Sequence, residues 1–176
     1  MLFRDGVQLA CGFVPSSTGP FYCPGDQKVH VDLAFFDHVA WQFGAPGEFA
    51  QAYVLAHEIG HHIQTVTGTE REVRAAQQRD QRSANARSVK MELQADCYAG
   101  VWAYSLAREG ILQAGDLEEG LRAASAVGAD RLQQQGAERV NPETLTHGSS
   151  ADRVAWFRCG FEGDDPNRCD SFGASR

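Results

Sequence analysis

Apolar positions along the chain predict extended pieces near its start and helices further on. Between residues 28 and 33, polar and apolar side chains alternate, which is typical of a half-buried strand. Residues 35–43 have the pattern of a short helix. Across residues 48–67, apolar side chains occupy nearly every side of a helical projection, and Gly68 follows as a C-cap. A helix that is apolar nearly all round belongs inside a domain, so its few polar residues should also lie inside.

Three further helices are predicted downstream, at about 88–107, 116–135 and 149–157, each with capping or periodicity signals. The polar stretch 69–88 has no clear amphipathic period, and we interpret it as a solvated loop or an exposed helix. The resulting prediction is an α+β, mainly α fold with a small N-terminal β-sheet.

Length and composition limit the classes of protein that this chain can belong to. With 176 residues and 43% apolar composition, we expect a single domain over residues 1–176. No apolar run approaches the roughly 18 residues that a membrane span requires. A net charge of -7 without a cluster of Lys and Arg argues against nucleic acid as a partner. The first residues have neither the charged region nor the apolar region of an export signal.

Five cysteines fall near the two ends of the chain and once in the middle. Their positions suggest two local bridges, Cys11 to Cys23 and Cys159 to Cys169, with Cys97 as a small buried hydrophobic residue. Pairing cannot be deduced from sequence alone, so five reduced thiols remain the alternative. Because the cytosol keeps thiols reduced, two bridges would indicate an extracytoplasmic location.

The candidate chemistry is concentrated in the motif His57-Glu58-Ile59-Gly60-His61 on the predicted 48–67 helix. Two histidines four residues apart lie on one helix face, about 6 Å apart along the axis, and can bind one ion such as Zn²⁺ through neutral imidazole nitrogen. Glu58 points roughly 100° round the helix, where it can act as general base on a metal-activated water. The alternative is a hydrogen-bonded polar cluster without metal, which is costly to bury.

A catalytic zinc ion keeps three protein ligands and one position for water, so the two histidines need a third partner. Glu92, on the predicted 88–107 helix, is our candidate. Asp96 follows one turn later on the same face and can accept the outward N–H of a ligand histidine, which would fix its tautomer. The alternative is a solvated pair of carboxylates on a helix surface, although Leu93 and Trp102 indicate that this helix is largely buried.

These motifs resemble those of the bacterial neutral zinc metallopeptidases. The resemblance extends over nearly the whole chain and is carried by four segments: GPFYCP at 19–24, HEIGHH at 57–62, ELQADC at 92–97 and HGSS at 147–150. The wider gluzincin pattern, with a downstream Glu as third ligand, is also similar. The resemblance implies a zincin-like domain in which His57, His61 and Glu92 bind zinc, Glu58 is the base and Asp96 supports a ligand. Family members usually begin further upstream with a membrane-anchoring segment, so we expect this chain to be a shortened form.

Three other residues near the motifs also receive candidate roles. His147 precedes a predicted helix and either donates to the oxyanion that forms at the peptide carbonyl, as a catalytic residue, or only caps and packs. Arg153 is expected to pair with an acidic neighbour, and His62, off the ligand face, to be a supporting or core histidine. We place the cleft between the 28–33 strand and the motif helix, with a peptide added along that strand's edge.

The sequence therefore predicts a zinc-dependent metalloendopeptidase that acts on a peptide or protein. One alternative is a peptide deformylase, which also uses a His-Glu-x-x-His helix but takes a cysteine as third ligand. No cysteine occupies a matching motif upstream of His57. The other alternative is a catalytically inactive zinc-binding or protein-interaction module that retains the fold, since a fold does not guarantee activity.

Overall fold

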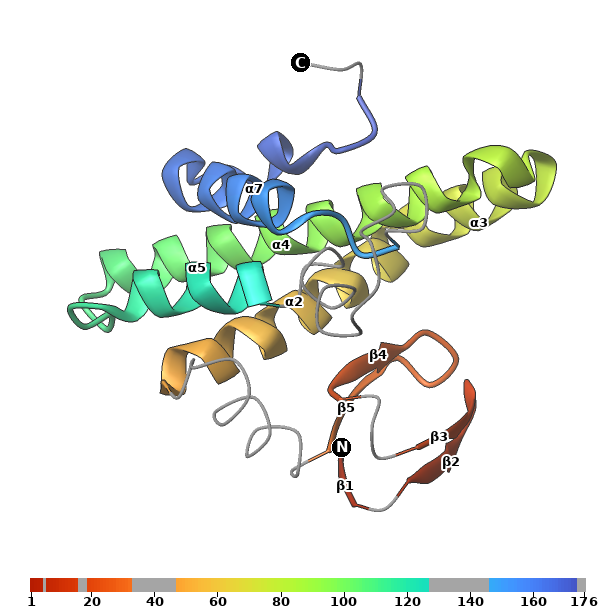
Figure 1. Cartoon of the computed structure of the whole chain (residues 1–176), viewed down its shortest axis with the longest axis horizontal. Helices are drawn as coiled ribbons and strands as arrows, with labels where there is room; N and C mark the ends of the chain where they lie inside the picture. The colour runs from red at the N-terminus through yellow and green to blue at the C-terminus, as the bar shows by residue number, and fades with distance from the viewer. Residues whose placement is uncertain (5, 16–18, 33–46, 127–145, 174–176) are drawn as a thin grey trace, which may run out of the picture.

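The computed structural model describes residues 1–4, 6–15, 19–32, 47–126 and 146–173. The helices are α2 (Glu48–Thr67), α3 (Thr69–Arg79), α4 (Ala84–Arg108), α5 (Asp116–Ala126), α7 (Ser150–Gly163) and the 3₁₀ turns η2 (Gln81–Ser83) and η4 (Pro166–Cys169). The strands are β1 (Leu2–Phe3), β2 (Val7–Leu9), β3 (Gly12–Val14), β4 (Phe21–Cys23) and β5 (Lys28–Asp32). Helices dominate and short strands gather near the N-terminus (Figure 1), so the predicted α+β, mainly α fold is confirmed.

The strands form two small sheets. β5 lies in the middle of a three-stranded sheet, antiparallel to β4 and parallel to β1, while β2 and β3 form a separate hairpin. The predicted strand at 28–33 is therefore present as β5. Both of its edges are paired, however, so the prediction that a peptide adds along the edge of this strand is wrong. Local alternation predicts a strand, but strand order depends on contacts between distant segments.

Helices α2, α4, α5 and α7 form the hydrophobic core. In Figure 1, α4 lies between α2 and α7, and α5 packs beside both α2 and α7. Their shared core contains three aromatic residues and five alanines: Phe49, Ala50, Tyr53, Ala99, Ala103, Ala123, Ala124 and Phe157. Small residues allow close approach, and a Cβ atom on either Gly100 or Gly160 would overlap the backbone of the facing helix. The α4 and α7 backbones therefore cross in direct contact.

Most predicted helices are present with shifted ends. The 48–67 helix is α2, and Gly68 ends it with a positive φ of 87°. Residues 69–88 form α3, η2 and the first turn of α4, which is the exposed-helix alternative, since only Val73 of α3 is buried. The last helix, α7, continues past the predicted end to residue 163. The short helix predicted at 35–43 and the end of the one predicted at 116–135 lie outside the described residues.

The disulfides differ from the predicted pairing. The Cys11–Cys23 bridge is confirmed, but Cys169 bonds to Cys97, and Cys159 is a free, half-buried thiol. The predicted Cys159 to Cys169 bridge is therefore wrong, and so is the prediction that Cys97 is an unbonded hydrophobic residue. Sequence proximity favoured the local pair, whereas the packing of α7 on α4 returns η4 to the side of α4 and brings the Cys97 and Cys169 Cα atoms to 5.5 Å.

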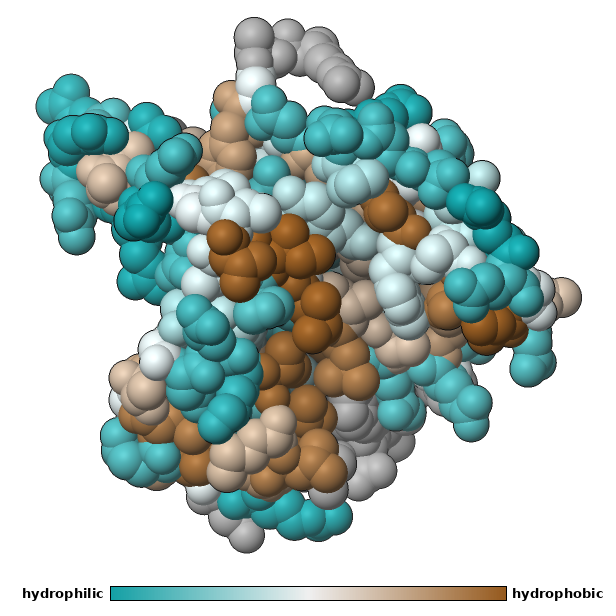
Figure 2. All heavy atoms as spheres, turned by 180° about the vertical axis from the view of Figure 1, so that it is seen from behind, coloured by the Kyte–Doolittle hydropathy of each residue, from teal (hydrophilic) through white to brown (hydrophobic). Residues whose placement is uncertain are grey.

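Hydrophobic side chains also reach the surface. Figure 2 shows one face of the molecule on which they gather in a band down the middle. Along α2, Leu55, Ile59 and Val66 are exposed, and a groove of about 410 Å³ between α2 and α4 is lined almost entirely by apolar groups. Among the described residues, no helix combines the length and apolar character that a bilayer crossing requires.

Candidate metal centre

Three predicted ligands from two helices meet at one point. His57 Nε2 lies 3.4 Å from Glu92 Oε2, and His61 Nε2 lies 3.5 Å from Glu92 Oε1. One donor atom from each residue lies within 4.8 Å of the other two. Tetrahedral zinc ligands with bonds of about 2.0–2.1 Å are separated from one another by about 3.3 Å. The spacing of these three side chains therefore fits a single zinc ion.

Gly60 determines how closely the two ligand helices approach. A Cβ atom at this position would lie 2.8 Å from Ala95 Cα and 2.9 Å from the Ala95 carbonyl oxygen. Any larger residue would push α2 away from α4. Because Gly60 lies between the two histidines and Ala95 lies between Glu92 and Asp96, this contact brings α4 within reach of the paired imidazoles.

The outward nitrogen of each imidazole bonds to an oxygen. His57 Nδ1 lies 2.8 Å from Asp96 Oδ1, and His61 Nδ1 lies 2.9 Å from Gln64 Oε1. Carboxylate and amide oxygens only accept hydrogen bonds, so both Nδ1 atoms act as donors. In the neutral imidazoles, this tautomer directs the Nε2 lone pairs toward Glu92, which is the arrangement that a metal ion requires.

Gln64 was not identified from the sequence, although its spacing could have revealed it. Its side chain is fully buried, and its amide nitrogen donates to the Met91 carbonyl oxygen at 2.7 Å and to Gln94 Oε1 at 3.0 Å. These two bonds orient the amide so that its oxygen faces His61. The sequence does contain a signal for this role. Gln64 follows the candidate ligand His61 by three residues on a helix that is apolar nearly all round, so its polar side chain was expected to lie inside.

Arg153 connects α7 to the site. Its guanidinium group donates to both oxygens of Asp96, at 2.8 and 2.9 Å, and Tyr53 also donates to this carboxylate. Arg153 and Asp96 are 3% and 0% exposed, so the pair is desolvated. The prediction that Arg153 pairs with an acidic neighbour is confirmed. The same guanidinium contacts both ring nitrogens of His57, at 3.2 and 3.4 Å, so it also limits the movement of this imidazole.

The charges in the site shift the pKa values of its members. Burial disfavours the charged form of His57, but the negative charge of Asp96 and the hydrogen bonds to Asp96 and Glu92 together outweigh it and raise the pKa of His57 to about 10. Burial would by itself raise the pKa of Glu92, yet contacts with His147 and His57 hold it well below the usual range of a glutamate. Glu92 is therefore an anion, which is the form that binds a metal.

Glu58 lies against the sheet. Its Oε2 atom accepts a hydrogen bond of 2.7 Å from the backbone amide of Tyr22 on β4. The side chain is buried, and burial raises the pKa of its carboxyl group even though the charges of His57 and His61 lower it. A carboxylate with a raised pKa accepts a proton more readily near neutral pH, as a general base must.

Strand β4 offers little to an added peptide strand. The amide of Tyr22 points away from β5 and is occupied by Glu58. By the alternation of a strand, Pro20 and Pro24 share this outward direction, and proline has no N–H. The β4 edge beside the site therefore has no free amide donor, as is common for protected sheet edges.

His147 and His62 lie beside the three candidate ligands. His147 is half-exposed, with its Nδ1 atom 3.2 Å from Glu92 Oε2, and its predicted role as a donor to the oxyanion stays a prediction. Gly148 follows with a φ of 76° and packs against Leu93, which brings this turn close to α4. His62 lies off the ligand face, where its Nδ1 atom is 3.1 Å from the Tyr22 hydroxyl group.

A cavity of about 430 Å³ opens beside the metal centre. His61 and Glu92 contribute to its wall, and so do Glu70 and Arg74 of α3. A cavity of this size can hold part of a peptide.

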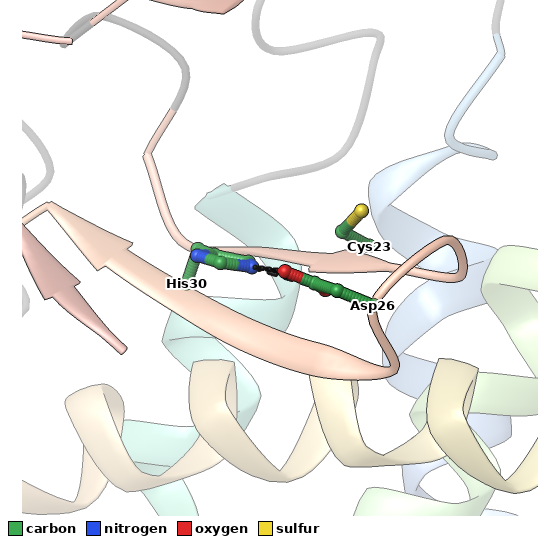
Figure 3. A group of neighbouring side chains, drawn as sticks. All are labelled: Cys23, Asp26 and His30. Carbon is green, nitrogen blue, oxygen red and sulfur yellow. Dashed lines mark hydrogen bonds and ion pairs between the residues drawn. The ribbon is translucent and has the colours of Figure 1, made fainter. Parts of the chain in front are cut away.

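A second group, Cys23, Asp26 and His30, also has the spacing of metal ligands (Figure 3). The sulfur of Cys23, however, is bonded to Cys11. The His30 Nε2 atom lies 3.0 and 3.2 Å from the two Asp26 oxygens, and its ring stacks on Phe21. We therefore interpret this group as a hydrogen-bonded pair of side chains, Asp26 and His30, that holds the β4–β5 turn to β5.

Comparison with known proteins agrees with this geometry. The model of the family described as "Putative neutral zinc metallopeptidase" matches residues 1–172. Escherichia coli YpfJ is 51% identical over 176 residues, which cover 99% of this chain and 61% of YpfJ. Mycobacterium tuberculosis Rv2575 is 46% identical over 185 residues, or 99% of this chain and 62% of Rv2575. Both are named as uncharacterized proteins.

The chain therefore spans about three fifths of the length of these relatives. No solved structure matches it. A family model that covers nearly the whole chain, together with relatives near half identity, assigns the protein: it belongs to the "Putative neutral zinc metallopeptidase" family.

Proposed function

We propose that this chain is the catalytic domain of a zinc-dependent metalloendopeptidase. The observation that carries the proposal is the meeting of His57, His61 and Glu92 at the spacing of tetrahedral zinc ligands. Two imidazoles and one carboxylate form a donor set of catalytic zinc sites, in which a fourth position serves water or substrate. A glutamate completes the group, so nothing here favours the cysteine-ligated deformylase.

Each residue then has a defined task. A bound zinc ion would polarise the peptide carbonyl group and acidify a water molecule. The Glu58 carboxylate accepts a proton from that water and returns it to the leaving nitrogen. Asp96 and Gln64 hold the imidazoles in the tautomer that presents Nε2. His147, half-exposed beside Glu92, donates a hydrogen bond to the oxyanion.

The disulfides and the neighbouring cavity bear on where the enzyme acts and on what. Two disulfides are stable in oxidising compartments, which supports an extracytoplasmic location. The substrate would be a peptide or an unfolded protein segment that enters the cavity beside His61. Main-chain addition to β4 is not part of the proposal, because that edge lacks free amides.

Replacement of Glu58 by Gln tests this function. The amide keeps the shape of the side chain but cannot accept the proton, so peptide cleavage should fall by a factor on the order of 10²–10⁴ while one zinc ion per chain is retained. Glu48→Gln, at an exposed position on the same helix, is the matched control and should leave cleavage unchanged.

The readouts are cleavage of a peptide library and metal content by atomic emission, each with and without chelator. Undiminished cleavage by the Glu58 variant would refute its role as base. Stoichiometric zinc without hydrolysis of any peptide would instead favour the inactive binding module.

A further inference from the structure

The cavity beside the metal centre has an apolar floor and a charged rim. Val73 of α3 is buried beneath it, and Met91 of α4 is partly buried. Glu70, which is partly buried, and Arg74, which is exposed, also line the cavity, and we call this pair the rim. A peptide that occupies this cavity would meet this pair, so the chemistry of the rim bears on which peptides bind.

The acidic member of the rim is already engaged within the protein. Glu70 Oε1 accepts from Arg74 Nε at 2.6 Å, and Oε2 accepts from the Thr65 hydroxyl group at 2.6 Å. The Glu70 side chain is only 15% exposed. Both oxygens therefore have donors, and this carboxylate has little remaining capacity to attract a cationic substrate group.

Arg74, the basic residue of the rim, has N–H donors that Glu70 does not use. A guanidinium group has five N–H donors, and Arg74 uses the one on Nε for Glu70. Glu70 is its hydrogen-bond partner among the described residues, and the Arg74 side chain is 65% exposed. The two terminal nitrogens form a fork that suits a carboxylate. Among the described residues that line the cavity, Arg74 is the one whose side chain carries a permanent positive charge.

The Arg74 guanidinium group lies about as far from the metal centre as a few residues of an extended peptide would span. Thr65 lies four residues, about 6 Å along the helix axis, beyond His61, and the hydrogen bonds from Thr65 through Glu70 lead to Arg74. The fork is then on the order of 10 Å from the His61 imidazole. An extended peptide spans about 3.3–3.6 Å per residue, so the fork is within about three residues of a peptide bond at the metal centre.

We propose that Arg74 binds a carboxylate group of the peptide substrate, and that Glu70 and Thr65 hold its guanidinium group in place. This inference rests on the proposed peptidase function and names its substrate class. The carboxylate comes either from an acidic side chain within about three residues of the cleaved bond or from the C-terminus of a short peptide.

The experiment compares matched peptides on the zinc-loaded chain. One series places Glu, Gln or Lys at each of the positions that flank the cleaved bond, and each peptide is made with a free or an amidated C-terminus. The variants are Arg74→Glu and Arg74→Gln. Arg71→Glu, an exposed residue of α3 that does not line the cavity, imposes the same charge change and is the matched control.

We expect the wild-type chain to cleave a carboxylate-bearing peptide with a kcat/KM about tenfold or more above its neutral counterpart, mainly through a lower KM. Arg74→Gln should remove this preference, Arg74→Glu should turn it toward Lys, and Arg71→Glu should keep it. A preference that survives amidation assigns the side chain as the source, and one that amidation abolishes assigns the C-terminus. Equal cleavage of acidic and neutral peptides by the wild type, or an unchanged preference in Arg74→Glu, overturns the inference.

Binding of the same peptides, labelled with a fluorophore, separates this inference from the proposed function. If no peptide is cleaved but binding still prefers a carboxylate and depends on Arg74, the peptidase proposal fails and the Arg74 site stands. If cleavage occurs without any dependence on Arg74, the peptidase proposal stands and the Arg74 site fails. Absence of cleavage together with binding that ignores the carboxylate refutes both.

Discussion

Replacement of Arg153 by Met tests the buried charge pair that supports the metal centre. The substitution preserves much of the side-chain volume but removes the guanidinium group, which is 3% exposed and makes two bonds to a fully buried Asp96. Removal of one partner from a buried ion pair typically costs about 3–5 kcal/mol. Tyr53 and His57 still contact Asp96 and offset part of this loss. We therefore expect the free energy of unfolding to fall by about 3 kcal/mol.

The same change should weaken zinc binding. Without the guanidinium group, Asp96 loses its bidentate partner and holds the His57 imidazole less firmly. Loss of a group that orients a ligand typically lowers metal affinity about 10–100-fold. Urea unfolding of the metal-free chain measures stability, and competition with a chromophoric chelator measures zinc affinity. Arg158→Met, exposed on the same helix, should change stability by less than about 0.5 kcal/mol.

A double-mutant cycle with Asp96→Asn tests whether the loss of stability in Arg153→Met arises from the Arg153–Asp96 pair. Either single substitution leaves one buried charge without its partner, whereas the double variant leaves neither. The double variant should therefore lose less free energy of unfolding than the sum of the two single losses, by several kcal/mol. Additive costs, or a loss below about 1 kcal/mol in Arg153→Met, would contradict the assignment of this pair as a support for His57.

Three further predictions test other parts of the fold and the site. Replacement of Cys97 and Cys169 by Ala should lower the free energy of unfolding in urea by about 4.4 kcal/mol, the chain-entropy value for a 72-residue separation, while Cys159→Ala should change it little. Gln64→Leu should lower zinc affinity about 10–100-fold in chelator competition, because it removes the acceptor of an imidazole N–H. Gly60→Ala should cost about 1–3 kcal/mol of thermal stability and reduce zinc affinity, because its Cβ would meet Ala95 and separate the ligand helices; an unchanged melting temperature would contradict this.

The parts of the site that the sequence predicted are those that depend on one helix at a time. A spacing of four residues puts His57 and His61 on one face of α2, and the same rule puts Glu92 and Asp96 together on α4. Helix period alone, however, does not bring α4 to α2. That step depends on Gly60 and Ala95, whose role as a close contact is visible only once both helices are placed.

The parts that the sequence missed or left open depend on contacts between distant segments. The pairing of Arg153 with an acidic residue was predicted, but no local pattern specified that its partner would be Asp96, 57 positions away in sequence. The Cys97–Cys169 bridge spans 72 positions, and it forms because α7 and η4 return along α4. Strand order has the same origin, since the alternation in β5 gives its buried face but not its neighbours.

The balance of charge explains why a divalent ion suits this site. Glu58, Glu92 and Asp96 are largely or fully buried, and Arg153 is the guanidinium group that lies among them. With neutral imidazoles, three carboxylates and one guanidinium leave two negative charges away from bulk water, which is costly unless cations or protons compensate. In the metal-free chain, protons supply part of the compensation, since the pKa values of both Glu58 and His57 are raised. A zinc ion carries the same two charges, so it can replace protons at His57 Nε2 and return Glu58 to the ionised form that a base requires.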